Sequence, residues 1–235
     1  MGDLKDTLSI VLPVFNEEGI TKRVIQEVYD NTCLLDSEVE IIAVNDGSTD
    51  STSEILYQMS QSLLNLKIVT HVRNEGYGAA LCSGIKSARK QWILLMDSDN
   101  QVHIDSLKDV WPYRFEYDVL LGYRQKRSDS FYRLVLGALG NRASNFFLKR
   151  NIFDINCGFK IFRKKLLEPL LLSSKGGIIN FEILYCLFKN SRSLRLYQFS
   201  VKHYPRVTGR STGGSPKVIL KIISESIKII LNNKS

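Results

Sequence analysis

The stretch Ile93-Leu94-Leu95-Met96-Asp97-Ser98-Asp99-Asn100-Gln101 decides the fold of this chain. Its apolar first half predicts a buried strand, and its polar second half predicts the turn in which that strand ends. The two carboxylates, Asp97 and Asp99, then lie at a sheet edge, which is where open α/β sheets bind ligands. Two neighbouring acids repel each other unless a cation lies beside them, and a divalent ion shared with substrate phosphates is the usual solution. Taken alone, the pair also fits a solvated acidic turn.

Three further strands are predicted before this stretch, over residues 8–14, 39–46 and 66–70. Each is compact and apolar, and each is followed by a helical pattern, so strand, turn and helix repeat along the chain. This repeat predicts an α/β protein with a mostly parallel sheet. We expect Pro13 to end the first strand, because proline cannot donate to a central ladder. We expect Asn16 to cap the helix that follows.

Three of these four strands end in polar groups suited to a nucleotide. The groups are Asn16 and Glu17, then Asp46, then Asp97 with Asp99. The carboxyl ends of parallel strands meet at one edge, so we expect these side chains to converge. One acidic turn is unremarkable, whereas several in one crevice favour a ligand site over a solvated surface.

The second half of the chain is basic and continues the alternation of helices and strands. Residues 1–121 hold 10 Lys+Arg and 19 Asp+Glu, whereas residues 122–235 hold 22 and 5. An acidic first half suits a metal site, and a basic second half suits an anionic partner or a membrane surface. The acids at the strand ends argue against nucleic acid there. The elements expected here are a helix at 105–114, a strand at 117–124 ending in Arg124, a helix at 130–149, a short strand within 154–163, a helix from Phe181, a strand at 194–201, a basic Gly/Ser-rich loop at 205–215 and an amphipathic basic helix at 216–231.

The composition is that of a globular protein of the cytosol. Hydrophobic residues make up 44% of the chain and charged residues 24%, and no apolar stretch approaches bilayer length. Residues 1–6 lack the regions of a signal peptide. The four cysteines form no CxxC pair and the three histidines are scattered, so we expect reduced thiols and no zinc site.

Taken together, these residues resemble the family 2 glycosyltransferases, and most closely the polyprenyl-phosphate sugar transferases of the dolichol-phosphate mannose synthase type. The matching segments, in the family's order, are Pro13-Val14-Phe15-Asn16-Glu17-Glu18, Asn45-Asp46-Gly47-Ser48-Thr49-Asp50-Ser51-Thr52, Asn74-Glu75-Gly76-Tyr77-Gly78, Asp97-Ser98-Asp99-Asn100-Gln101, Gly122-Tyr123-Arg124, Cys157-Gly158-Phe159-Lys160 and Arg206-Val207-Thr208-Gly209-Arg210-Ser211. The chain departs from the family pattern at Tyr123, where a small residue is common, and after Ser211, where a basic residue is common.

The resemblance implies a GT-A fold, a nucleotide-sugar donor and Mg²⁺ or Mn²⁺ as cofactor. The implied metal site is a DXD motif, with Asp97, Asp99 and Gln101. The implied nucleotide site comprises Pro13, Phe15, Asn16, Glu17, Val44, Asp46, Met96, Asp97, Ser98 and Gln101. The acceptor phosphate would meet Arg124, Arg133, Arg206, Arg210 and Ser211, and the implied catalytic set is Asp97, Asp99, Arg124, Arg133 and Arg206.

We therefore predict a metal-dependent, inverting transfer of a sugar to a polyprenyl phosphate. A phosphate acceptor is already ionised and needs no strong base, which fits a second half rich in Arg and poor in acids. Transfer to a glycan or lipid-linked hydroxyl is the first alternative, with Asp154 or Glu182 as base unless they only form ion pairs. A nucleotidyltransferase and a non-catalytic nucleotide-binding module are the others.

The predicted organisation is one GT-A domain over residues 1–212, followed by a linker and the amphipathic helix over residues 213–235. Within the domain, the nucleotide-sugar half reaches about residue 121 and the acceptor half begins at about residue 122. The basic half and the terminal helix would hold the enzyme at the cytosolic face of a membrane. The helix could equally dock on its own domain or pair two copies of the chain.

Overall fold

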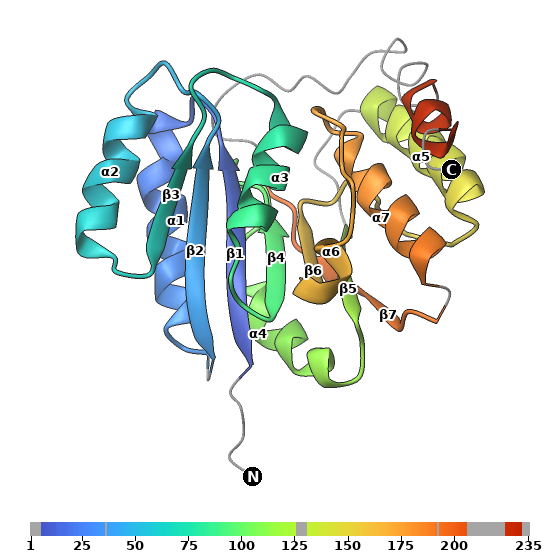
Figure 1. Cartoon of the computed structure of the whole chain (residues 1–235), viewed down its shortest axis with the longest axis horizontal. Helices are drawn as coiled ribbons and strands as arrows, with labels where there is room; N and C mark the ends of the chain where they lie inside the picture. Colours follow the sequence, from blue (N-terminus) through green and yellow to red (C-terminus); the bar gives the residue numbers. More distant parts are fainter. Residues whose placement is uncertain (1–5, 36, 126–130, 192, 206–223, 232–235) are drawn as a thin grey trace.

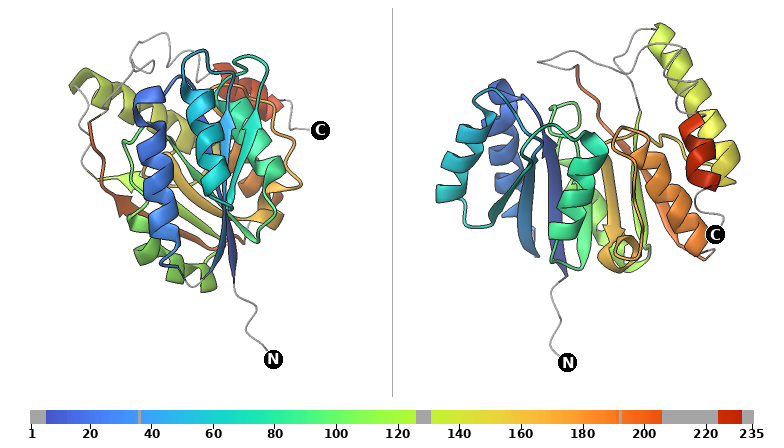
Figure 2. Two further views of the ribbon diagram at one scale, coloured as in Figure 1. Left: turned by 90° about the vertical axis from the view of Figure 1, so that its left-hand side faces the viewer. Right: turned by 45° about the horizontal axis from the view of Figure 1, so that its top comes forward.

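The protein is described by a computed structural model that covers residues 6–35, 37–125, 131–191, 193–205 and 224–231. Within these residues, seven strands form one sheet with helices on both faces (Figures 1 and 2). The strands are β1 (Thr7–Val14), β2 (Glu38–Asn45), β3 (Leu66–Thr70), β4 (Trp92–Met96), β5 (Val119–Arg124), β6 (Phe159–Arg163) and β7 (Leu196–Val201). The helices are α1 (Glu18–Thr32), α2 (Thr52–Ser62), α3 (Tyr77–Ser87), α4 (Ser106–Val110), a 3₁₀ turn (Trp111–Phe115), α5 (Phe131–Leu148), α6 (Lys164–Leu167) and α7 (Ile179–Asn190).

The strand order places the predicted ligand edge at a topological switch point. The order is β3-β2-β1-β4-β6-β5-β7, and only β6 runs against the other strands. The chain moves outward from β1 to β2 and β3, then returns to place β4 on the other side of β1. In open α/β sheets the crevice beyond such a point binds the ligand. The carboxyl ends of β1 and β4 are therefore the place to look for a site.

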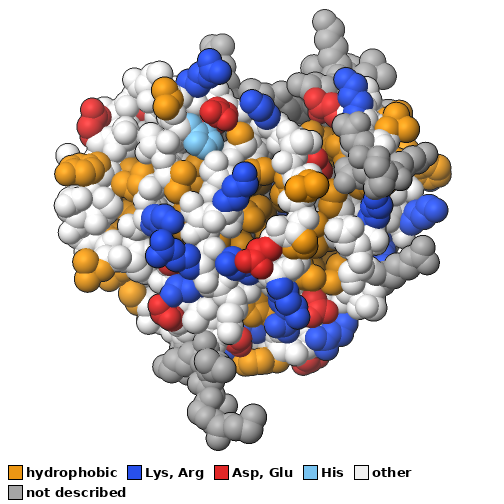
Figure 3. Space-filling view, viewed as in Figure 1, with side chains coloured by type: hydrophobic (Ala, Val, Ile, Leu, Met, Phe, Trp, Pro, Cys, Tyr) orange, Lys and Arg blue, Asp and Glu red, His pale blue; other side chains and the backbone are white. Residues whose placement is uncertain are grey.

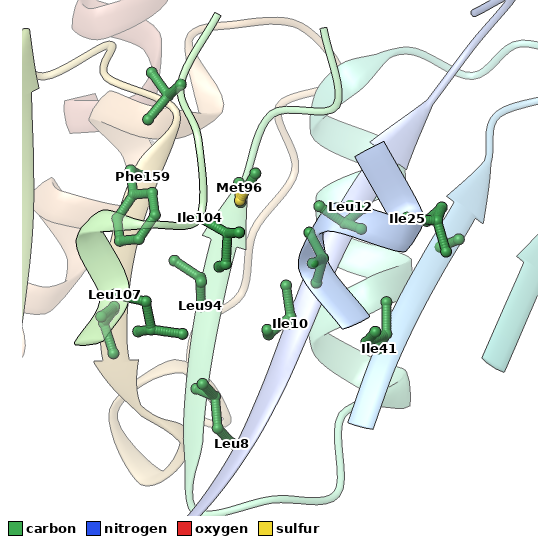
Figure 4. Packing of buried hydrophobic residues seen from close by; sticks show 14 of the residues in the cluster. Leu8, Ile10, Leu12, Ile25, Ile41, Leu94, Met96, Ile104, Leu107 and Phe159 are labelled. Atoms are coloured by element: carbon green, nitrogen blue, oxygen red, sulfur yellow. The ribbon is translucent and has the colours of Figure 1, made fainter. Parts of the chain in front are cut away.

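The core lies on both faces of the sheet, as the alternation of side chains along a strand requires. Leu8, Ile10 and Leu12 of β1 point to the face covered by α1, α2 and α4, where Leu94 and Phe159 join them (Figure 4). Residues of the opposite register pack under α3, α6 and α7. The mostly parallel α/β architecture predicted from the sequence is confirmed.

Two local predictions about the first strand and helix were wrong. Pro13 does not end β1, which runs to Val14, with Pro13 in register opposite Val44. The ladder between β1 and β4 stops at Val11, so the missing N–H of Pro13 leaves no gap in that ladder. Asn16 is not the helix cap either: Glu17 takes that position, and Asn16 has a left-handed backbone with φ of 50°.

The helix predicted at 105–114 divides into α4 and the 3₁₀ turn. Pro112 lacks the N–H that an α-helix needs and stands at the start of that turn. The helix predicted from Phe181 begins two residues earlier, at Ile179. The antiparallel placement of β6 between β4 and β5 was not foreseen.

The terminal helix docks on its own domain over its described part, residues 224–231. Ile229 is buried in the same cluster as Leu148 of α5 and Leu187 of α7. The helix lies beside α5 in the views of Figures 1 and 2. The loop and the start of the helix predicted over residues 206–223 lie outside the described residues.

Candidate active site

The two carboxylates stand where β4 leaves the sheet, as predicted. The main-chain N–H of Asp97 donates to the carbonyl of Gly158 (3.0 Å), so β6 holds the start of the turn. The hydroxyl of Tyr77 donates to Oδ1 of Asp97 (2.7 Å). Burial and the charge of Asp97 raise the pKa of Tyr77 well above its usual range, so this phenol stays a donor.

The rest of the turn is fixed from both sides. The hydroxyl of Ser98 donates to the carbonyl of Pro13 (2.5 Å), which ties the end of β4 to the end of β1 across the switch point. The main-chain N–H of Gln101 donates to Oδ1 of Asp99 (3.1 Å), and Asn100 between them has φ of 60°. Asp97 and Asp99 are both partly exposed. The carboxylates are thus presented by a turn whose shape is set by the protein.

The loop after β1 interlocks with the loop after β2. The side chain of Asn16 accepts from the N–H of Thr49 (2.8 Å), and the N–H of Asn16 donates to Ser48 (3.0 Å). Glu17 is buried, whereas Phe15 beside it is exposed. The loop after β1 is therefore held in place by hydrogen bonds, and it exposes the ring of Phe15, one of the residues predicted to bind the nucleotide.

Asp46 organises the loop after β3. Its carboxylate accepts from the N–H groups of Glu75 and Gly76 (both 2.9 Å) and from Nδ1 of His71 (2.6 Å). Nε2 of His71 lies 2.8 Å from the hydroxyl of Ser83 on α3. Asp46 is buried, and these contacts make it a support for the start of α3.

Arg124 is delivered at the end of β5, on the same edge as the carboxylates, because β4 and β5 run in the same direction. Its guanidinium makes a forked contact with Asp154, at 2.6 and 2.9 Å. Burial alone would lower the pKa of Arg124. The hydrogen bonds and charge of Asp154 outweigh this effect, so the pKa of Arg124 is raised overall, and the charge of Asp97 acts in the same direction. Asp154 was predicted to be either a general base or an ion-pair partner, and in the structure it is the ion-pair partner of Arg124.

Glu182, the other acid considered as a base, has a different environment. It is buried on α7, and its carboxylate accepts from the N–H and hydroxyl of Ser173 and from the N–H of Ser174. These contacts are with serine residues, whereas the alternative role expected for Glu182 was an ion pair with a local Arg or Lys. The loop that Glu182 holds covers the start of α3, where the carbonyl of Lys175 accepts from the N–H of Gly78 (2.7 Å).

The segment after β7 returns to the carboxylate turn. The N–H of Tyr204 donates to the carbonyl of Gln101 (2.9 Å), and the amide of Gln101 donates back to the carbonyl of Tyr204 (3.4 Å). The ring of Tyr204 also packs against the ring of His103 at a tilt of 50°, and His103 contacts Glu27. The segment that leads toward the residues predicted to bind the acceptor phosphate therefore passes along the carboxylate turn.

The glycosyl transferase family 2 model matches residues 9–171, which include every strand end described above except that of β7. The chain belongs to glycosyl transferase family 2. The resemblance inferred from the motifs is confirmed.

Two curated relatives from this family act on polyprenyl phosphates by name. The chain is 29% identical over 235 residues to dodecaprenyl-phosphate galacturonate synthase of Rhizobium johnstonii, covering 96% of this chain and 64% of the relative. It is 24% identical over 210 residues to undecaprenyl-phosphate 4-deoxy-4-formamido-L-arabinose transferase of Aeromonas hydrophila, covering 88% and 63%. The chain thus spans somewhat less than two thirds of the length of these relatives.

Solved structures confirm the GT-A fold that family 2 membership implies. Glucosyl-3-phosphoglycerate synthase of Mycobacterium tuberculosis, in complex with Mn²⁺, UDP-glucose and phosphoglyceric acid, superposes with a TM-score of 0.72. The sequence identity is 19%, and the match covers 95% of this chain and 79% of the other. A second complex of the same enzyme, with Mg²⁺ and UDP, gives a TM-score of 0.69. At this identity the likeness is one of fold.

The remaining predicted residues of this family 2 site fall into two groups. The side chains of Val44 and Met96 are buried in the core, and both residues are paired with neighbouring strands of the sheet. Arg206, Arg210 and Ser211 lie outside the described residues, as does the side chain of Arg133, whose backbone is in α5.

The sequence motifs contained three residues of this region to which no role had been assigned. Tyr77, Gly158 and Lys160 were each part of a family segment, but their places beside Asp97 and β4 depend on how α3 and β6 meet β4. An added Cβ at Gly158 would lie 1.9 Å from Oδ2 of Asp97, so glycine is needed there. The motifs therefore contained these residues, but their role could be inferred only from their positions in the fold.

The residues present fit a divalent cation that is shared with a substrate. Asp97 and Asp99 offer oxygen ligands, which Mg²⁺ and Mn²⁺ prefer. Among the described residues no cluster of three or more His, Cys, Asp or Glu side chains forms a metal site. Such a donor set matches an ion held by one or two carboxylates and completed by substrate phosphates.

Proposed function

We propose that this chain transfers a sugar from a nucleotide-sugar donor to a polyprenyl phosphate at the cytosolic face of a membrane. The observation that carries the proposal is the meeting of two kinds of charge at one sheet edge. Asp97 and Asp99 end β4, and Arg124 ends β5 within electrostatic range of Asp97. A cation-binding pair beside an arginine suits two phosphate groups that must approach each other. The printed names of the two curated relatives support the same acceptor.

On the donor side, Phe15 and Asn16 would hold the base and ribose on the rigid loop after β1. Asp46 would act mainly through the loop after β3, because its carboxylate already accepts three hydrogen bonds. Asp97 and Asp99, with Gln101 beside them, would hold Mg²⁺ or Mn²⁺ against the diphosphate. When bound, such an ion neutralises charge on the leaving diphosphate as a Lewis acid.

On the acceptor side, Arg124 would orient the phosphate, with Arg133, Arg206, Arg210 and Ser211 as further contacts. A phosphate oxygen attacks without a general base, and the acids near the site are already engaged. Asp154 holds Arg124, and Glu182 holds the loop at Ser173. This arrangement favours an ionised phosphate over a hydroxyl acceptor, and the displacement is expected to invert the anomeric centre.

A stripe of exposed side chains on α5 supports contact with a membrane. Val135, Leu139, Arg142 and Phe146 follow helical spacing and lie on one face of the helix, exposed to solvent. On the face seen in Figure 3, Lys and Arg side chains are spread among apolar ones. Among the described residues, no helix is long and apolar enough to span a bilayer. The α5 stripe would therefore rest on the surface of an anionic membrane.

The proposed reaction is tested by a donor screen. The protein is incubated with radiolabelled nucleotide sugars and Mn²⁺ or Mg²⁺, with undecaprenyl phosphate or with a glycan acceptor. We expect label in the organic phase that depends on both the metal and the lipid phosphate. Label on the glycan alone would overturn the lipid acceptor, and no transfer from any donor would overturn the enzyme assignment.

The membrane contact is tested by sedimentation with lipid vesicles. Replacing Leu139 and Phe146 with Asp should reduce binding to phosphatidylglycerol vesicles, whereas Asp at Leu64, an exposed leucine after α2, should not. Equal binding by all variants would refute the role of the α5 stripe. A concentration-dependent dimer that the same substitutions dissolve would show instead that a second copy covers it.

A further inference from the structure

Lys160 is a buried amine that the proposed reaction does not use. It lies on β6 opposite Leu95 of β4, is 1% exposed, and its Nζ donates to the carbonyl of Cys157 and to Oδ1 of Asn180. Burial lowers the pKa of Lys160, while the nearby Cys157, Asp97 and Asp154 favour its charged form. A cation is kept in such a place at considerable cost unless charged groups nearby stabilise it.

A series of polar side chains leads from this amine to the carboxylate turn. The first step runs from Nζ of Lys160 to Oδ1 of Asn180 on α7 (2.9 Å). The side chain of Asn180 also acts on the hydroxyl of Tyr77 at the start of α3, whose pKa it lowers against the larger effects of burial and Asp97. The hydroxyl of Tyr77 donates to Oδ1 of Asp97 (2.7 Å). Lys160 and the carboxylate of Asp97 therefore stand at the two ends of this series, with Asn180 and Tyr77 between them.

The opposite side of Asp97 is closed by the main chain of β6. Oδ2 lies against the α-carbon of Gly158, where an added Cβ would come within 1.9 Å. The N–H of Asp97 donates to the carbonyl of the same glycine. The carboxylate is thus fixed at one oxygen by Tyr77 and confined at the other by Gly158. Both contacts come from residues outside the carboxylate turn itself.

We propose that Lys160, Asn180 and Tyr77 are positioning residues that hold Asp97 in one orientation for the divalent cation. The charged form of Lys160 would also offset the repulsion between the carboxylates of Asp97 and Asp99. The turn would then keep its shape before the cation binds. Groups that orient metal ligands in this way typically change metal affinity by about 10–100-fold when removed. This inference rests on the proposed function, because it assumes that the carboxylate turn binds a metal-nucleotide complex.

The test measures binding of Mn²⁺ together with the nucleoside diphosphate of whichever donor the screen identifies. Binding is followed by calorimetry, and the Mn²⁺ concentration for half-maximal transfer is measured in parallel. Tyr77→Phe removes one hydroxyl and keeps the ring. Tyr185→Phe is the matched control, since Tyr185 is a partly buried tyrosine on α7 that stacks on Phe181.

We expect Tyr77→Phe to weaken Mn²⁺ binding by about tenfold, and to raise the half-activating Mn²⁺ concentration similarly, with transfer restored at saturating Mn²⁺. Tyr185→Phe should match the wild type. Lys160→Met keeps most of the length of the side chain without its charge and should lower both thermal stability and Mn²⁺ affinity. Gly158→Ala, which displaces Asp97 from the other side, should weaken Mn²⁺ binding even if Lys160→Met fails to fold.

The outcomes separate this inference from the function on which it rests. If the wild type binds the complex and Tyr77→Phe binds it equally well, the positioning role is refuted and the proposed function stands. If Lys160→Met loses stability but keeps wild-type Mn²⁺ affinity, Lys160 is only a structural residue. If the wild type itself binds no metal-nucleotide complex, the proposed function fails.

Discussion

Replacing Asp154 with asparagine should lower the free energy of unfolding by about 3 kcal/mol and leave the transfer chemistry in place. The carboxylate makes a forked contact with Arg124, and the two side chains are only 12% and 14% exposed. Removing one partner of a buried pair costs about 3–5 kcal/mol, and the lower end applies here because some water reaches the pair. For a chain of this size, about 3 kcal/mol corresponds to a fall in Tm of roughly 6–12 °C.

The assay combines thermal unfolding with transfer kinetics for Asp154→Asn, Arg124→Met and the double variant. The double variant should lose little more stability than either single variant, since both remove the same pair. Arg124→Met should also raise KM for the lipid phosphate. If Asp154 were instead a general base, Asp154→Asn would reduce kcat by about 10²-fold or more and flatten the pH-rate profile. Such a loss with an unchanged Tm would refute the structural role.

Three further predictions concern other titratable groups. Glu182→Gln should lower Tm, because it weakens the bonds to Ser173 and Ser174, while transfer keeps its pH profile; a profile without its acidic limb would indicate a base. Burial opposes ionisation of Asp118, but hydrogen bonds from Arg195 and Arg163 lower its pKa overall, so its contribution to stability is complete above about pH 4 and is lost as the pH falls further. The free energy of unfolding, measured with urea, should therefore change less with pH below 4 in Asp118→Asn than in the wild type. An equal change with pH in both proteins would contradict the stabilising role of the ionised Asp118. Burial raises the pKa of Cys157 to about 12 and that of Cys186 to about 11, so exposed Cys33 should react first with Ellman's reagent at pH 8, and rapid labelling of Cys157 would be inconsistent with this environment.

The carboxylate turn could be predicted because its position follows from local sequence alone. A short apolar run must be buried, and the polar residues that follow it must lie at the end of the strand. The same reasoning placed Arg124 at the end of β5. Parallel strands then bring both ends to one edge, whatever the details of packing. The positions of the carboxylate pair and the arginine could therefore be predicted without a structure.

The supports of that turn could not be predicted in the same way. Lys160 is a polar residue in a short strand, and nothing in the sequence near it says that it is buried. Its environment arises because β6 inserts antiparallel between β4 and β5, which places Gly158 against Asp97, and because Asn180 of α7 packs against Lys160. The contact of His71 with Asp46 likewise joins elements that are 25 residues apart. Such contacts depend on register and topology, which local patterns do not encode.

The most direct test of the proposed function is the transfer activity of Asp99→Asn and Asp99→Ala with undecaprenyl phosphate as acceptor. Asp99 is partly exposed on the carboxylate turn, so neither change should unfold the protein. Loss of several kcal/mol of charge stabilisation should reduce metal-dependent transfer by about 10³-fold or more at an unchanged Tm. Full transfer by either variant would show that the carboxylate turn at the end of β4 is not the centre of the reaction.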